Sequence, residues 1–289
     1  MWIERVLVYG LALFVILTFL GCVLYGATQQ MRTYRRVALF RQQMTQGYYY
    51  DALETIKQAI NINRYDGQCY LQQAQAHVKL RDYQAALDDY NLALRHSRTG
   101  DEAAAYAGRA SVYCCLEQYN DALVDANHAI ACNRHAWYAY VARGHAYLGL
   151  EHYKVALDDF EQAQQLAIET KAPICYGLAL ALYAATEYGR AIGWAQQAVV
   201  LDAENADACA LLGGILVGCE RLEEARAQLE QALRLNPQLA RVYFYLAQLH
   251  FAELHYAEAQ TALVQCVKME QPQVERKAAQ ILLTSLLRR

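Results

Sequence analysis

The chain has 289 residues and a formal net charge of −3, from 26 lysine and arginine residues against 29 aspartate and glutamate residues. This charge argues against nucleic acid as the main partner, because phosphate binding requires a basic face. Hydrophobic residues make up 56% of the chain, more than in an ordinary soluble domain, and part of this excess lies near the N-terminus.

The N-terminal segment has the composition of a membrane anchor. Residues 6–31 contain no charged side chain, and a helix needs about 20 apolar residues to cross a bilayer. The sequence therefore predicts a transmembrane anchor over residues 1–31, with residues 6–27 in contact with the lipid bilayer. Two alternatives remain open: acylation of Cys22, which ends the lipobox-like stretch FLGC, or cleavage near Ala27 to release a secreted protein.

Basic residues next to this segment predict its orientation. Arg32, Arg35, Arg36 and Arg41 follow it, whereas Arg5 alone precedes it. Because positive charge favours the cytoplasmic side, we expect a single-pass membrane protein whose remaining chain faces the cytoplasm. The four membrane-proximal arginines either contact anionic headgroups or act only as a topology signal. Scattered cysteines without paired spacing fit a reducing compartment.

The rest of the chain repeats one unit. The stretch LRDYQAALDDYNLA at 80–93 aligns with LEQYNDALVDANHA at 116–129 and with LEHYKVALDDFEQA at 150–163. The period is about 34 residues. The units in register are 33–66, 67–100, 103–136, 137–170, 172–205, 206–239 and 240–273, seven in all. Their twentieth position is always alanine, at Ala52, Ala86, Ala122, Ala156, Ala191, Ala225 and Ala259.

Each unit is predicted to form two packed helices. It contains two apolar-periodic segments of helical length, with small residues where a neighbouring helix must come close. A two-helix unit of this size cannot bury its own apolar face, so successive units must stack into a solenoid. Residues 274–289 carry apolar residues on one face and charges on the other, and are predicted to form a C-terminal capping helix.

The repeated pattern resembles the tetratricopeptide repeat (TPR) family over residues 33–273. The resemblance implies an all-α, helix-turn-helix superhelical solenoid whose first helices line a concave groove. The helix-ending proline of the family occurs here only as Pro237, which leaves the angles between units open. Because no proline interrupts residues 27–33, we expect the N-terminal segment to continue as one helix into the first unit.

Two pairs of adjacent carboxylates recur in phase with the repeat. Asp88–Asp89 and Asp158–Asp159 occupy the same two positions of their units. A catalytic dyad has no reason to recur in this way, and adjacent residues on a helix do not face each other. We interpret both pairs as solvated faces of second helices.

The sequence offers little for metal or covalent chemistry. His128 and Cys132 lie at i and i+4 without the further ligands that zinc needs, and His250 and His255 give the same weak signal. None of the serines lies in a GxSxG elbow. We therefore expect no enzyme, no catalytic residue, no metal, no cofactor and no small-molecule substrate.

The concave groove is the predicted site. By resemblance to the family, the groove side chains fall at fixed positions of each first helix, and several of them could pack against the next unit instead. Tyrosine and phenylalanine are anchors that binding hot spots favour. The candidate partner-binding residues are Tyr138, Val141, His145, Leu148, Tyr176, Leu180, Tyr183, Arg241, Phe244, Gln248 and Phe251.

Together these patterns predict a non-enzymatic, membrane-anchored TPR scaffold. Its partner would be a protein, docked as an extended peptide or an amphipathic helix. By analogy with the architecture of other anchored TPR proteins, it would be an assembly or adaptor factor for a membrane protein complex, photosystems among them. The alternative is a periplasmic scaffold, lipid-anchored through Cys22, for pilus or outer-membrane biogenesis.

Overall fold

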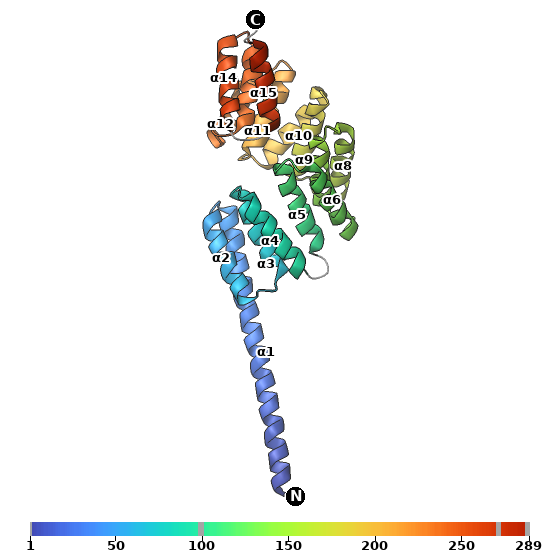
Figure 1. Ribbon diagram of the computed structural model, residues 1–289, viewed down its shortest axis with the longest axis vertical. Coiled ribbons are helices and arrows are strands. Elements are labelled where there is room, and N and C mark those ends of the chain that lie inside the picture. The colour runs from blue at the N-terminus through green and yellow to red at the C-terminus, as the bar shows by residue number, and fades with distance from the viewer. Residues whose placement is uncertain (1, 98–100, 270–272, 287–289) are drawn as a thin grey trace.

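The computed structural model describes residues 2–97, 101–269 and 273–286, with the side chains of residues 18–21, 23–97, 101–269 and 278–284. Within these residues all regular secondary structure is helical, so the predicted all-α solenoid is confirmed. Helices pair in chain order and the pairs stack along the long axis of the molecule (Figure 1). The helices are α1 Trp2–Thr45, α2 Tyr49–Ile62, α3 Gly67–Lys79, α4 Tyr83–His96, α5 Glu102–Cys115, α6 Tyr119–Cys132, α7 Trp137–Gly149, α8 Tyr153–Leu166, α9 Ala172–Ala184, α10 Tyr188–Leu201, α11 Ala206–Gly218, α12 Leu222–Leu235, α13 Ala240–Ala252, α14 Tyr256–Lys268 and α15 Gln273–Leu286.

The predicted membrane anchor is not supported. Among the described residues, no helix is both long enough and apolar enough to span a membrane. The prediction of a single-pass protein, with residues 6–27 in the bilayer and the repeats on the cytoplasmic side, is therefore wrong. Among the side chains of α1 that the structure describes, the apolar stretch is short, because the polar residues Thr28, Gln29 and Gln30 and then Arg32 follow it. The side chains of residues 1–17 and of Cys22, on which the acylation alternative depends, lie outside the described residues.

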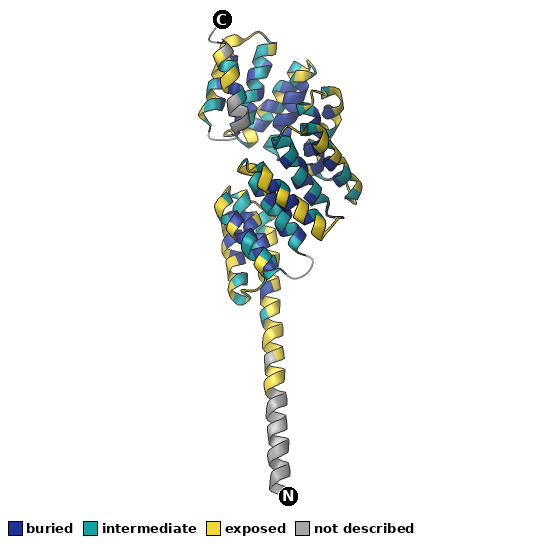
Figure 2. Ribbon diagram, turned by 45° about the vertical axis from the view of Figure 1, so that its right-hand side comes forward, coloured by how far each residue is buried: buried dark blue, intermediate teal, exposed yellow. Residues whose placement is uncertain are grey.

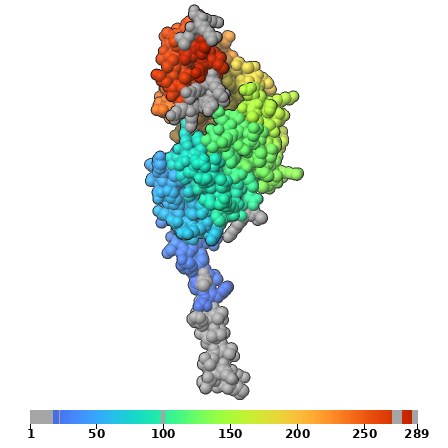
Figure 3. Space-filling model, in the orientation of Figure 1, coloured from blue at the N-terminus to red at the C-terminus, as the bar shows by residue number. Residues whose placement is uncertain are grey.

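Helix α1 is continuous from Trp2 to Thr45, as expected from the absence of a helix breaker. Its C-terminal part packs against α2, where Phe40 is buried with Leu53 and Ile56. The part before this contact projects from the stack, and the side chains of residues 18–21 and 23–32 are largely exposed (Figures 2 and 3). Arg32, Arg35, Arg36 and Arg41 are all exposed along this helix.

The turns inside the helix pairs share one backbone conformation. A non-glycine residue with φ between 60° and 63° ends the first helix of six pairs, and Gly47 does so with φ 79° in the turn after α1. This left-handed residue lets its own amide and the following one donate to carbonyl oxygens at the helix end. In the turn between α3 and α4, Arg81 N donates to Val78 O at 3.0 Å and Asp82 N donates to His77 O at 2.9 Å. The division of residues 33–273 into units at the predicted boundaries stays a prediction.

Small residues set the helix spacing in the core. The alanines at the twentieth position of the units are all fully buried, including Ala52 and Ala259. Gly67 begins α3 against the end of α4, and a Cβ there would lie 2.8 Å from the backbone carbonyl of His96. Close packing of this kind leaves no room for an added methylene. At the other end of the chain, Ala279 of α15 is buried against α13 and α14, so α15 covers the last helix pair.

Only the first aspartate of each adjacent pair is exposed to solvent as predicted. Asp88 and Asp158 are exposed, but Asp89 and Asp159 are buried, with exposed fractions of 6% and 5%. The interpretation as solvated faces is therefore wrong for the second member of each pair. Successive side chains on a helix point about 100° apart, so one carboxylate faces water while the other faces the neighbouring helix. There, Arg143 donates to both oxygens of Asp159.

Candidate functional site

The predicted groove residues lie on three first helices, α7, α9 and α13. The structure makes Val141 a core residue, buried with Phe160 and Ile174. The other candidates are half-buried, so each packs partly against its neighbours and keeps part of its surface free: Tyr138, His145 and Leu148 on α7, Tyr176, Leu180 and Tyr183 on α9, and Arg241, Phe244, Gln248 and Phe251 on α13. The sequence reasoning therefore named one core residue among its groove residues.

Side chains of α9 and α13 meet across the face of α11. Arg241 Nη1 donates to the hydroxyl oxygen of Tyr176, and also to Asp207 Oδ1 on α11 at 3.1 Å. Seven residues further along both helices, the Tyr183 hydroxyl donates to Gln248 Oε1 at 3.3 Å. First helices from alternate pairs thus contact each other through side chains. Arg241 of α13 is held by groups from two other helices, α9 and α11.

His145 adds a neutral ring to this cluster. Its ring lies edge-on to Phe160, with centroids 5.2 Å apart, and 6.4 Å from the ring of Tyr176. Burial on the inner face, together with the charge of Arg241, lowers the pKa of His145 to about 4. His145 is therefore uncharged near neutral pH, and Arg241 is the cation of the cluster.

The inner face also approaches α4 and α5. Burial raises the pKa of Tyr83, at the start of α4, and the pKa of Cys115, at the end of α5. The two side chains are hydrogen-bonded, and the carboxylate of Asp207 on α11 contributes to both shifts. Tyr83 and Cys115 therefore lie within electrostatic reach of the same aspartate that contacts Arg241. The raised pKa keeps the Cys115 thiol protonated, which disfavours a nucleophilic role.

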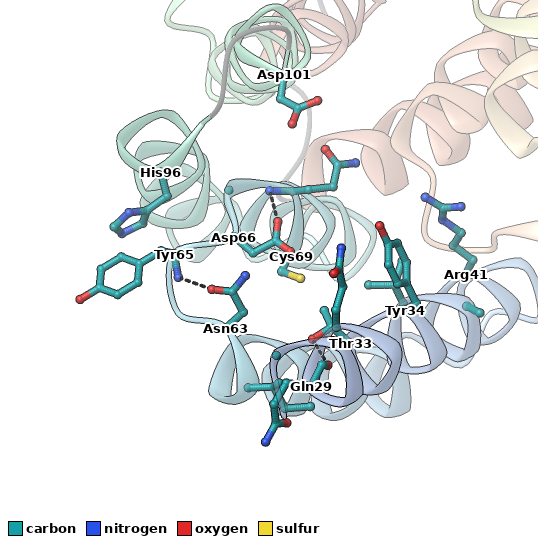
Figure 4. A pocket seen from close by; sticks show the side chains of 17 residues that line it. Gln29, Thr33, Tyr34, Arg41, Asn63, Tyr65, Asp66, Cys69, His96 and Asp101 are labelled. Atoms are coloured by element: carbon teal, nitrogen blue, oxygen red, sulfur yellow. Dashed lines mark hydrogen bonds between the residues drawn. The ribbon is translucent and has the colours of Figure 1, made fainter. Parts of the chain in front are cut away.

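A pocket of about 720 Å³ lies where α1 meets the turn between α2 and α3 (Figure 4). Its lining is mostly polar and includes Gln29, Thr33, Tyr34 and Arg41 from α1. The opposite wall contains Asn63, whose side-chain oxygen accepts from Tyr65 N at 3.3 Å, and Asp66, which caps α3 by accepting from Gln68 N at 3.1 Å. Sequence reasoning missed this pocket because residues 26–31 were assigned to the anchor. The polar run TQQ at 28–30 was the available signal.

The buried thiol in this pocket is unreactive. Cys69 of α3 is buried against α1 and α2, and burial raises its pKa to about 12, with the charge of Asp66 acting in the same direction. The thiolate, which is the reactive form of cysteine, is therefore scarce at neutral pH. His128 and Cys132, considered above as metal ligands, are exposed and join no third ligand within the described residues.

Comparison with known proteins supports the resemblance found in the sequence. A "TPR repeat" family model matches residues 213–253, and a "Tetratricopeptide repeat" model matches residues 67–98 and 138–167. The heat shock protein STI1 of Saccharomyces cerevisiae is 31% identical over 103 residues. This match covers 36% of the present chain and spans only 17% of the length of that protein.

Solved structures share the fold at low sequence identity. A tetratricopeptide repeat protein from Parabacteroides merdae superposes with a TM-score of 0.58 at 17% identity, covering 89% of this chain and 99% of that one. The APC/C hetero-tetramer Cut9-Hcn1 contains a chain that superposes with a TM-score of 0.70 at 16% identity, covering 86% of this chain and 48% of that one. Family models and solved structures together support the tetratricopeptide repeat family, and the described chain is an all-α, TPR-like solenoid.

Proposed function

We propose that this protein is a non-catalytic scaffold that binds protein partners on the inner face of its solenoid. The observation that carries the proposal is the cluster around Arg241, which gathers Tyr176 of α9 and Asp207 of α11 on a half-buried surface. Arginine and tyrosine in partly desolvated positions are the residue types enriched at binding hot spots. TPR proteins in general mediate protein–protein interactions as scaffolds, which supports the same reading.

The partner would be an extended peptide or an amphipathic helix with apolar side chains. Tyr183 and Phe244 offer apolar ring surface, while Arg241 offers a cation whose position is already fixed by its hydrogen bonds. A surface that is ordered before binding loses less conformational entropy when the partner docks. The finer proposal is an adaptor or assembly role for a protein complex, because a non-catalytic scaffold acts by holding its protein partners together.

The proposal is tested by selecting peptides from a displayed random library on the purified full chain. We expect Tyr176→Ala and Phe244→Ala to weaken the selected peptides about tenfold or more, the loss expected of hot-spot residues. Tyr50→Ala is the control, because it removes an exposed tyrosine from α2, a second helix away from the inner face. Circular dichroism of each variant checks that the helices remain folded.

Two results would overturn the proposed surface. The first is a selection that enriches no peptide for the full chain over an unrelated helical protein. The second is peptide binding of equal strength to the wild-type protein, Tyr176→Ala and Phe244→Ala, with binding lost instead in Tyr50→Ala. That pattern would move the binding surface to the outer helices.

A further inference from the structure

The turn between α13 and α14 gathers three possible metal ligands. His250 lies in the last turn of α13, Glu253 ends that helix, and His255 precedes the first residue of α14. The turn is closed by His255 N donating to His250 O at 2.8 Å, with Leu254 in the left-handed region at φ 63°. The backbone therefore fixes the three residues relative to one another, which a metal site requires of its ligands.

The distances suit a tetrahedral ion. Nδ1 of His250 and Nδ1 of His255 each lie 3.5 Å from Oε2 of Glu253, and the three atoms all lie within 4.8 Å of one another. Zinc binds histidine nitrogen and carboxylate oxygen at about 2.0–2.2 Å, so two ligands of a tetrahedral zinc are separated by about 3.4 Å. The two nitrogen–oxygen separations already have this length. Only the two imidazoles need to approach each other slightly.

Two of these atoms are buried and lack a hydrogen-bond partner. Among the described residues, neither Nδ1 of His250 nor Oε2 of Glu253 has a hydrogen-bond partner, although both are shielded from solvent. Buried polar atoms in proteins are almost always satisfied, so two unsatisfied atoms aimed at one point need an explanation. In the tautomer of His250 that carries its proton on Nε2, both atoms are acceptors, and a cation between them satisfies both at once.

The second oxygen of the carboxylate is held by an arginine. Arg226 Nη2 on α12 donates to Oε1 of Glu253 at 2.5 Å, which orients the group and leaves Oε2 for the ion. Glu223 and Glu230 also act on Arg226, and three carboxylates against one guanidinium give a local formal balance of −2. The surroundings are therefore favourable to a divalent cation despite the arginine.

We infer that His250, Glu253 and His255 bind a zinc ion at the turn between α13 and α14. Two imidazoles and one carboxylate in tetrahedral spacing are a ligand set that zinc accepts, with water in the fourth position. His255 has an exposed fraction of 57%, whereas Glu253 has 14%, so the ion would enter from the side of His255. Arg226 is a positioning residue that acts through Glu253. The ion would cross-link the two helices of the last pair and stabilise this end of the solenoid by mass action.

The inference is tested by titrating zinc into the untagged full chain after treatment with a chelator, with calorimetry as the readout. Cobalt(II) serves as a second probe, because tetrahedral coordination gives it strong visible absorption bands. We expect one ion per chain. His255→Ala and Glu253→Gln should each abolish the cobalt spectrum, and His135→Ala, which removes an exposed histidine elsewhere, should leave it unchanged. Arg226→Gln should weaken zinc about 10- to 100-fold, as loss of an outer hydrogen bond does.

His255→Ala is not expected to unfold the protein, because His255 is exposed and its replacement removes no core contact. An absence of zinc binding in the wild-type chain would overturn the inference. So would zinc binding of equal affinity in His255→Ala and in Glu253→Gln, which would place the ion elsewhere. A rise in the thermal midpoint with zinc, seen in the wild type and in His135→Ala but not in His255→Ala, would support the cross-link between α13 and α14.

Discussion

The helix pairs α5–α6 and α7–α8 hold a buried aspartate with an arginine, whereas α3–α4 holds the equivalent aspartate with a neutral glutamine. Arg109 donates to both carboxylate oxygens of Asp125 at 2.6 and 2.7 Å, and Arg143 does the same to Asp159 at 2.9 and 2.7 Å. In both pairs the remaining nitrogen, Nη1, donates to an asparagine of the preceding second helix, at 2.5 and 2.9 Å. One guanidinium thus joins two successive helix pairs.

Asp89, the equivalent buried aspartate of α3–α4, has no arginine partner. Gln73 Nε2 donates a single hydrogen bond of 3.1 Å to Asp89 Oδ1. Oδ2 is buried 3.6 Å from His77 Nε2 and has no hydrogen-bond partner among the described residues. Burial raises the pKa of Asp89 to about 7, because one neutral hydrogen bond does not replace the lost hydration. One buried position can therefore hold either an ion pair or a carboxyl group that is protonated up to near neutral pH.

The largest loss of stability is expected from removing the arginine of a buried arginine–aspartate pair. Arg143→Ala leaves the carboxylate of Asp159 buried without its charged donor, and breaking a buried pair in this way costs about 3–5 kcal/mol. The free energy of unfolding, measured by urea denaturation, should fall by this amount. Hydrogen exchange should locate the loss in α7 and α8, because solenoid repeats contact mainly their neighbours. A loss below about 1 kcal/mol would put this pair with ordinary surface ion pairs.

The second effect is a dependence of stability on pH. The folded pKa of Asp89, about 7, lies above its unfolded value of about 3.9, so the folded state binds the proton more tightly. The stabilisation is complete below the unfolded pKa and is lost as pH rises toward the folded pKa, by at most about 1.4 kcal/mol per pH unit. Asp89→Asn keeps the shape and cannot ionise. At pH 8 it should be more stable than the wild type by about 1–3 kcal/mol, and at pH 4 it should not.

Urea denaturation of both proteins between pH 4 and pH 8 measures this difference. His77 and Asp82 are ionisable neighbours, but both remain in the variant, so their contributions largely cancel in the comparison. Parallel pH profiles for the wild type and Asp89→Asn would show that Asp89 is ionised throughout this range.

The repeat unit and the fold were predictable from the sequence, but the contacts between units were not. The register assigned Tyr176 and Arg241 to the same surface, yet their hydrogen bond depends on the curvature of the solenoid, which sums small angles between successive pairs. The burial of Asp159 was predictable in principle. Arg143 precedes it by 16 residues, and Arg109 precedes Asp125 by the same interval. This spacing, and not the adjacency of two aspartates, is the sequence signal for the buried ion pair.

The candidate metal ligands were missed for a different reason. His250 and His255 were noted in the sequence, but Glu253 between them was not, although it lies three residues after His250 and therefore on the same helix face. The left-handed residue Leu254 turns the chain back and brings the three side chains together. A local backbone reversal of this kind has no signature in hydrophobic periodicity.

A third and smaller effect is expected from building the arginine pair into α3–α4. Gln73→Arg supplies a charged donor to Asp89, but the new guanidinium would lie near Lys57, which stands where the other pairs have asparagine. The double variant Gln73→Arg/Lys57→Asn removes this repulsion. At pH 8 we expect it to gain about 1 kcal/mol in the free energy of unfolding, with a smaller gain in the single variant. A larger gain from the single variant than from the double would show that Lys57 does not oppose the arginine.

The smallest effect is expected from an exposed pair of the same length. Arg190 Nη1 lies 2.6 Å from Glu187 Oε2, as close as Arg109 Nε lies to Asp125 Oδ2, so distance alone would give both pairs the same strength. Arg190 has an exposed fraction of 59%, however, and water compensates the glutamate once the arginine is removed. Arg190→Ala should therefore cost at most about 0.5 kcal/mol in urea denaturation, and 1 M salt should abolish even this cost. If Arg190→Ala proved as costly as Arg143→Ala, burial would not be what separates the two kinds of pair, and the raised pKa of Asp89 would need another cause.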